Sequence, residues 1–204
     1  LQNKYGIIVM SHVSVVAATV QKILDVQITW KICDDGRISS TMEAVKDSEF
    51  PVLPRFGIRL FLDSRLDDTA YFGMGPKESY RDKNKSSYHG FFRAHVNDLH
   101  EDYVRPQENG SHYDCDYVTV NSPKFGITAV SENPFSFSAS SYTQEMLENS
   151  AHNFELVASE STVLCIDYAL NGIGSNSCGP EVLKKYQFDE NEFLFKFTLV
   201  PFVK

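Results

Sequence analysis

The segment formed by residues 23–33 constrains the fold more than any other part of the chain. Apolar side chains occupy every second position from Leu24 to Ile32, and polar side chains lie between them. A period of two places alternate side chains on opposite faces of an extended chain, so this segment predicts a β-strand. Asp34-Asp35-Gly36 follows, and residues 37–42 read as a strand again. Asp-Gly between two such segments predicts a hairpin and therefore antiparallel pairing.

The rest of the sequence predicts further strands and almost no helix. Residues 55–63 alternate in the same way, and Asp67-Asp68 separates them from residues 69–74, which predicts a second hairpin. Thr143 begins the helix that we expect, which is shorter than three turns. More strands are expected within residues 5–19 (one or two strands) and at residues 116–120, 125–130, 135–140, 162–170 and 192–203. We therefore predict an all-β fold, a large antiparallel β-sandwich formed by residues 1–204 as a single domain.

The charge balance and the cysteine spacing disfavour several kinds of partner. The formal net charge is −8, and an acidic surface repels nucleic acid and anionic membranes, so we expect neither as a partner. The longest apolar run is too short to span a bilayer. No Cys-x-x-Cys pair occurs, and we expect no metal site in this chain. The four cysteines are Cys33, Cys115, Cys165 and Cys178.

Residues 75–112 form a long polar region, and long regions of this kind are typically functional or part of an interface. Glycoside hydrolysis needs two carboxylates, and a His–Glu pair can open and close a sugar ring by acid/base chemistry. The competing interpretation is that these groups are solvated surface residues. The candidate carboxylate pairs are Glu78 with Asp82, Glu101 with Asp102, and Asp114 with Asp116. The histidines are His12, His89, His95, His100, His112 and His152, four of them between positions 89 and 112.

Residues 171–180 (NGIGSNSCGP) form a loop rich in glycine and small polar residues directly after an apolar strand. Glycine permits positive φ and close approach of backbones, so we expect a tight loop that fits against another surface. Cys178 lies in this loop, but a nucleophilic thiol needs a base or a positive field, and no histidine lies near it in the sequence. We therefore expect a structural or substrate-adjacent thiol.

Four motifs follow one another along the chain. They are LPRFG at residues 53–57, YFGMGPKESYRDK at 71–83, YVRPQENG at 103–110 and the loop at 171–180. Taken together, in this order and with this spacing, they resemble the C-terminal domain of bacterial β-galactosidases of glycoside hydrolase family 2. The resemblance covers nearly the whole chain.

The resemblance implies a supersandwich of the galactose-mutarotase-like kind within an enzyme that hydrolyses terminal β-D-galactosides such as lactose. It places the two catalytic glutamates and the magnesium ligands in a TIM barrel, on the same chain or on a large subunit, and none of that barrel is present here. We accordingly expect no catalytic residue and no cofactor in this chain, a start part-way into the domain, and a cytoplasmic location.

The resemblance also implies that the glycine-rich loop reaches the mouth of the barrel. Where some members of the family have a tryptophan that stacks on the sugar, this chain has Cys178, which offers no aromatic face. The loop residues that we expect beside the substrate are Gly172, Gly174, Ser175, Asn176, Ser177 and Cys178. The charged motif residues Arg55, Glu78, Asp82 and Glu108 are expected to form buried pairs that order the loops.

Two alternatives come from other functional classes. An aldose 1-epimerase occurs on a similar fold and would need a His and a Glu that converge on one concave face. An independent carbohydrate-binding module would need exposed aromatic side chains, for which Tyr71, Tyr80 and Tyr88 are the candidates.

Overall fold

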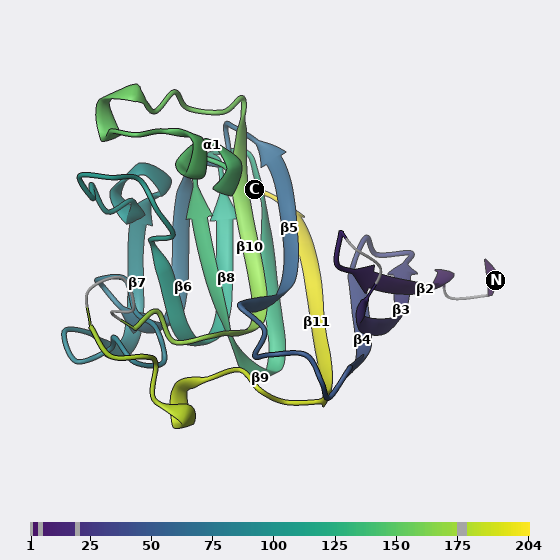
Figure 1. Ribbon diagram of the computed structural model, residues 1–204. Helices are drawn as coiled ribbons and strands as arrows, with labels where there is room; N and C mark the ends of the chain where they lie inside the picture. Colours follow the sequence, from purple (N-terminus) through teal and green to yellow (C-terminus); the bar gives the residue numbers. More distant parts are fainter. Residues whose placement is uncertain (1, 4–5, 19–20, 175–178) are drawn as a thin grey trace.

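The computed structural model describes residues 2–3, 6–18, 21–174 and 179–204, which are mostly β-strand (Figure 1). The α-helix of the described residues, α1 (Gln144–Asn149), begins where it was predicted, because the Thr143 hydroxyl accepts a hydrogen bond from the Met146 N–H at 3.2 Å. The strands are β1 (Gln2–Asn3), β2 (Gly6–Val16), β3 (Lys22–Cys33), β4 (Ile38–Lys46), β5 (Arg55–Asp63), β6 (Asp68–Gly75), β7 (Tyr88–His95), β8 (Ser111–Asn121), β9 (Phe125–Ser140), β10 (Ser161–Leu170) and β11 (Glu192–Val203).

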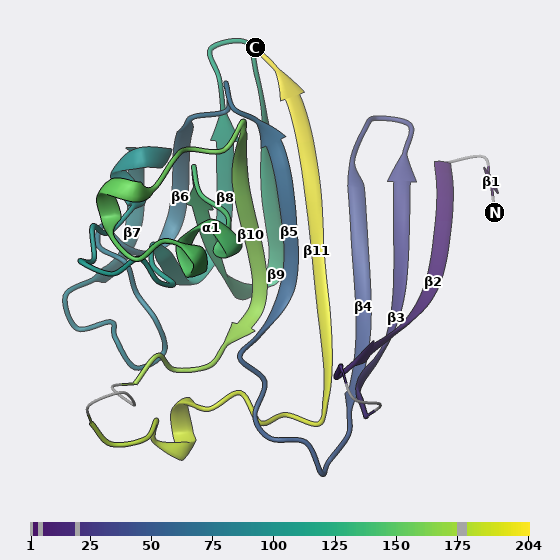
Figure 2. The same ribbon diagram turned by 45° about the horizontal axis from the view of Figure 1, so that its top comes forward.

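These strands form an antiparallel sheet that branches at β9. The main path runs β1-β2-β3-β4-β11-β9-β8-β6-β7. One half of β9, residues 125–130, pairs with β11, whereas residues 136–140 pair with β10, which in turn pairs with β5. Figure 2 shows β11 between the β2–β4 strands and the rest of the sheet.

The branch brings β5 and β10 against β11 and encloses the core. The ring centroids of Phe56 (β5) and Phe193 (β11) lie 4.8 Å apart, and those of Tyr168 (β10) and Phe193 lie 5.1 Å apart. Alternation along β11 buries Phe193, Phe195 and Phe197 in this layer. The predicted all-β sandwich is confirmed.

The first predicted hairpin is confirmed and the second is wrong. Strands β3 and β4 pair from Leu24–Lys46 to Ile32–Ile38, and Gly36 in the turn has φ of 84°. Strand β5 pairs with β10 and not with β6, while β6 lies between β7 and β8. The local pattern could not reveal this, because the partner of Asp63 at the end of β5 is Ser161 of β10, which is far away in the sequence.

Two other expectations need correction. The polar region at residues 75–112 contains the edge strand β7 and a 3-10 helix, η1 (Val96–Leu99). Strand β7 was not predicted because its sequence does not alternate strictly between apolar and polar residues. The strands expected at 125–130 and 135–140 form one strand, β9. Pro134 fits within β9 because residues 131–134 lie between the segments that pair with β11 and β10, where no ladder hydrogen bond is required of it.

Within the described residues, no helix has the length and apolar character needed to cross a bilayer.

Candidate functional site

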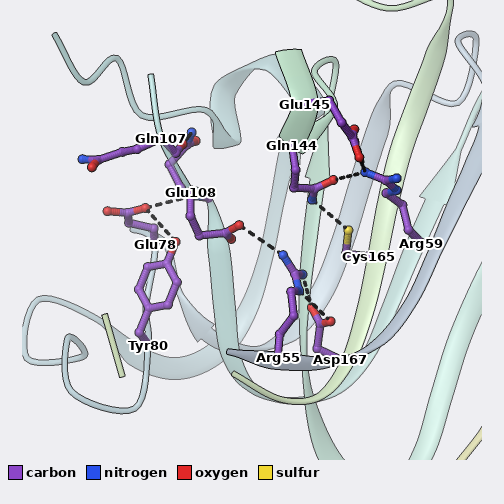
Figure 3. A network of polar contacts seen from close by, with 12 residues as sticks. Arg55, Arg59, Glu78, Tyr80, Gln107, Glu108, Gln144, Glu145, Cys165 and Asp167 are labelled. Carbon is purple, nitrogen blue, oxygen red and sulfur yellow. Dashed lines mark hydrogen bonds and ion pairs between the residues drawn. The ribbon is translucent and has the colours of Figure 1, made fainter. Parts of the chain in front are cut away.

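Arg55 is the centre of a partly buried ionic cluster at the start of β5 (Figure 3). Its Nε and Nη2 donate to the two carboxylate oxygens of Asp167 at 3.2 and 2.5 Å, and its Nη1 donates to Glu108 Oε2 at 3.1 Å. Asp167 is almost fully buried, with 3% of its side chain exposed. Burial raises the pKa of Asp167 to about 6, although Arg55 acts in the opposite direction. The pKa of Glu108 is also raised by burial against the pull of Arg55.

The neighbouring backbone explains why the cluster forms at this point. Asp167 lies at a register shift of the β5–β10 pair, where the strand bends. It also lies beside Gly57, where a Cβ atom would meet Ile166 O at 2.3 Å and Asp167 Oδ1 at 2.4 Å. The glycine of the LPRFG motif therefore leaves the space in which the Asp167 carboxylate meets Arg55.

Glu78 is a second buried carboxylate, and it binds the 103–110 segment to the residues that follow β6. Its carboxylate accepts hydrogen bonds from Lys83 Nζ, from the Tyr103 hydroxyl and, at 2.8 Å, from the Gly110 N–H. Burial pushes the pKa of Glu78 upward, but these three hydrogen bonds outweigh it and hold the pKa below its ordinary value. Tyr80 lies beside this carboxylate and is buried.

Asp82 holds the start of the glycine-rich loop. Its two carboxylate oxygens accept hydrogen bonds from the backbone N–H groups of Ile173 at 3.0 Å and Gly174 at 2.7 Å. Gly174 has φ of 54°, and a Cβ atom at Gly172 would meet Val182 Cγ1 at 2.8 Å and Asp82 Cγ at 2.9 Å. Glycine is thus favoured at position 174 by the backbone conformation and at position 172 by the close approach of the Val182 and Asp82 side chains. The other predicted loop residues, Ser175, Asn176, Ser177 and Cys178, lie outside the described residues.

Further bonds fix the two ends of the loop to each other. The Gly172 N–H donates to Tyr186 O at 2.8 Å, and the Asn171 side chain accepts from the Phe188 N–H at 3.0 Å. The Gln187 side chain donates to Val182 O at 3.1 Å. Residues 171–174 and 182–188 therefore form a pinned base for the loop.

Two hollows border the ionic cluster. One of about 390 Å³ is lined by Arg55, Arg59, Gln144, Cys165 and Asp167 among others, and one of about 320 Å³ lies between residues 105–108 and helix α1. Gln144 lines both hollows, and its side chain accepts from Arg59 Nη1 at 2.6 Å and donates to Cys165 Sγ at 3.4 Å (Figure 3). The charges of the cluster are paired with one another, which suits ordering of the loops.

Comparison with known proteins decides the family of this chain. A family model described as the β-galactosidase small chain matches residues 2–199.

The chain belongs to the β-galactosidase small-chain family.

Three curated relatives show how much of an enzyme the chain represents. The β-galactosidase of Actinobacillus pleuropneumoniae is 43% identical over 187 residues, which are 92% of this chain and 18% of the relative. That of Staphylococcus xylosus is 34% identical over 98% of this chain and 20% of the relative. That of Kluyveromyces lactis is 30% identical over 79% of this chain and 16% of the relative. This member of the small-chain family thus spans about a fifth or less of the curated relatives it matches.

The candidate carboxylate pairs do not converge in this family member. Asp114 has φ of 56° and sits at a register shift in β8, so it and the exposed Asp116 do not follow a regular alternation. Glu78 and Asp82 bind different loops, as described above. Asp102 accepts from the Asn153 side chain, and the Glu101 N–H donates to Asn109.

The histidines do not supply the epimerase arrangement either. His112 is buried and stacked on Phe137, and burial lowers its pKa to about 4. The His–Glu ion pair within the described residues is His152–Glu155, at 3.2 Å on an exposed turn. In the same part of the chain, no three His, Cys, Asp or Glu side chains gather as metal ligands would.

Sequence reasoning missed Asp167, the main partner of Arg55. The available signal was its position, because it is the one charged residue in an otherwise apolar strand, residues 162–170. A carboxylate in such a strand needs a buried cation or donor.

Proposed function

We propose that these 204 residues are a non-catalytic part of a β-galactosidase of glycoside hydrolase family 2, and that they border its active site through the loop at residues 172–178. The enzyme would hydrolyse terminal β-D-galactosides such as lactose, as a step of lactose catabolism, by the retaining mechanism with two glutamates. Those glutamates and the magnesium would belong to a barrel domain outside these residues, on the same chain or on a large subunit. This chain would contribute the shape of the mouth.

The observation that carries the proposal is the Asp82 carboxylate bound to two successive N–H groups of the loop. A glycine-rich loop loses conformational entropy when it is ordered, so a charged group that fixes its start favours one geometry. With residues 171–174 and 182–188 pinned, the tip between them is presented from a rigid base. Such a base suits a loop that contacts a substrate held by another domain.

The exposed face of β2 supports a partner for this chain. Val13 and Val9 pair with Val26 and Trp30 of β3, so they continue the apolar face that β4 and β11 bury further along the sheet. Val9 is nevertheless 46% exposed and Val13 41% exposed. An apolar sheet face is normally covered by other residues, and the proposed barrel-bearing part of the enzyme supplies residues to cover this one.

We also propose that the enzyme is cytoplasmic. The described cysteines Cys33, Cys115 and Cys165 are free thiols, in keeping with a reducing compartment.

Purified alone, the 204-residue chain is expected to hydrolyse no chromogenic β-galactoside, because the proposed catalytic glutamates lie outside it. Adding the remainder of the enzyme is expected to give hydrolysis. The assay compares the chain, the remainder and their mixture. Turnover by the chain alone that is lost on changing one of its own carboxylates would contradict the proposal.

In the intact enzyme, Asp82→Ala is expected to lower kcat/KM about tenfold or more, because two charge-assisted hydrogen bonds to the loop are lost. Asp82→Asn retains one acceptor oxygen and is expected to lose less. Asp116→Ala, on the exposed side of β8, is the matched control and should match the wild type. Steady-state kinetics on two galactosides with different leaving groups measure the effect. Wild-type kinetics for Asp82→Ala would refute the proposed role of the loop.

A further inference from the structure

The face of β6, β7 and β8 that points away from the core carries a shallow trough. It encloses about 520 Å³. Strand register places Arg93, Ala70 and Thr119 in one row across the three strands, and Phe91, Phe72 and Tyr117 in the next. The residues that line the trough are Asp68, Thr69, Ala70, Phe91, Arg93, Tyr117, Thr119, Asn121, Phe202 and Lys204.

The trough results from small side chains between large ones. Ala70 and Thr119 form a low floor, and the aromatic rings of Phe91, Tyr117 and Phe202 stand around it. Phe91 is 51% exposed although it is a large apolar residue. Phe202 lies against Gly126, where a Cβ atom would come within 2.5 Å of the ring. The rings therefore border an open floor that one small molecule can enter.

The polar groups of the trough are mostly held in place by one another. Asp68 pairs with His95 at 2.7 Å, and the Asn121 side chain donates to Asp68 O at 3.3 Å and accepts from Lys204 Nζ. Lys204 also donates to Ser122 O. Arg93 lies over the Phe91 ring at 5.4 Å, and no ion pair joins its guanidinium to another described residue. Rigid polar groups thus surround apolar rings, with one cationic donor left for a ligand.

This combination matches the chemistry of a sugar ring. A pyranose has an apolar face of C–H groups, which packs on aromatic rings, and an edge of hydroxyl groups, which bonds to donors and acceptors. A fully apolar ligand would leave the Arg93 donors unused. The trough carries the cations Arg93 and Lys204 together with the carboxylate of Asp68, and such mixed charges suit a neutral ligand better than a strongly anionic one.

We propose that the trough is a binding site for a neutral saccharide, with Phe91 and Tyr117 as packing surfaces and Arg93 as hydrogen-bond donor. The site lies at the opposite end of β6 from Asp82. Residues 68 and 75 are about 23 Å apart along an extended strand. The inference does not depend on the function proposed for the loop.

The test is ligand-observed saturation-transfer NMR on the intact enzyme with a hydrolysis-resistant thio-β-galactoside at millimolar concentration. A tight inhibitor is first added at micromolar concentration until hydrolysis of a chromogenic galactoside stops. The wild type is expected to keep a saturation-transfer signal under these conditions, with a dissociation constant of the order of a millimolar. Ala70→Leu fills the floor and should abolish the signal, and Phe91→Ala should weaken binding at least about fivefold.

Phe61→Ala is the matched control, since Phe61 is an aromatic residue on β5, outside the trough, and is 58% exposed against 51% for Phe91. It is expected to bind as the wild type does. Because Ala70 and Phe91 point away from the core, their variants should fold, which circular dichroism checks. Absence of signal in the inhibited wild type, an unchanged signal in Ala70→Leu, or an equal loss in Phe61→Ala would each overturn the proposal. Failure of the loop proposal would show in the Asp82 kinetics and would leave this result unchanged.

Discussion

Replacing Arg55 with alanine is expected to destabilise the sandwich by about 3–5 kcal/mol, because removing one partner of a buried ion pair leaves the other charge uncompensated. Arg55 donates three hydrogen bonds to two carboxylates, and the Asp167 side chain, which is 3% exposed, offers almost no surface on which water could replace them. The loss should be local to β5 and β10. Amide hydrogen exchange of these two strands in the intact enzyme reports the free energy of opening.

The loss of stability caused by Arg55→Ala should depend on pH. Without the guanidinium, the pKa values of Asp167 and Glu108 in the folded state rise further above those in the unfolded chain. A carboxyl group whose folded pKa is raised loses its stabilising contribution as pH increases through that pKa. In the wild type this loss for Asp167 is complete near pH 6, whereas in the variant it continues above it. The difference in the free energy of opening between the variant and the wild type should therefore be larger at pH 7.5 than at pH 5.5.

Arg65→Ala is the control for Arg55→Ala. Arg65 also pairs with an aspartate of β5, Asp63, but its side chain is 70% exposed. Exposed pairs contribute little, so this variant should exchange as the wild type does at both pH values. Equal hydrogen exchange of β5 and β10 in the two arginine variants would show that the buried pair stabilises these strands no more than the exposed pair does.

Gly57→Ala is expected to cost about 3 kcal/mol, at the upper end of the range for overpacking. The added methyl would lie 2.3 Å from Ile166 O and 2.4 Å from Asp167 Oδ1, so either the β5–β10 pairing or the Arg55–Asp167 pair must shift. Hydrogen exchange of β10 measures the result. Because both changes disturb one pair, the double variant with Arg55→Ala should lose less than the sum of the two single effects.

Gly90→Ala in β7 provides the comparison. Its added methyl would meet the Tyr88 ring at 3.3 Å, a side-chain atom that can move. The change should be neutral or slightly stabilising, because alanine restricts the unfolded chain. A Gly57→Ala variant as stable as Gly90→Ala would contradict the close packing described for the LPRFG motif.

The parts of the fold that were predictable from the sequence depend on local patterns. The alternation of residues 23–33 with Asp-Gly after it gave the β3–β4 hairpin, and Thr143 gave the helix start. The partner of β5 was not predictable in this way. Its apolar face suits β6 as well as β10, and the strand with which it pairs, residues 161–170, is far away in the sequence.

The candidate site was likewise predictable only in part. The motifs drew attention to Arg55, Glu78, Asp82 and Glu108, and the structure places each of them in a polar contact that orders a loop or strand. Their partners were not evident, since Arg55 and Asp167 are 112 positions apart. Only the fold, through the β5–β10 pairing, brings such residues together.

The position of β11 has a consequence for how the chain acquires its structure. This strand is the last in sequence of those described, yet it lies between β4 and β9, and the Ser39 and Thr198 hydroxyls meet at 2.9 Å across 159 positions. Contacts between distant residues are slow to form, because the closure entropy of the intervening chain comes first. During synthesis, strands β2–β4 must wait for residues 192–203 to leave the ribosome before they join the sheet. Until then the edge of β4 that pairs with β11 is unpaired, and an unpaired strand edge favours aggregation.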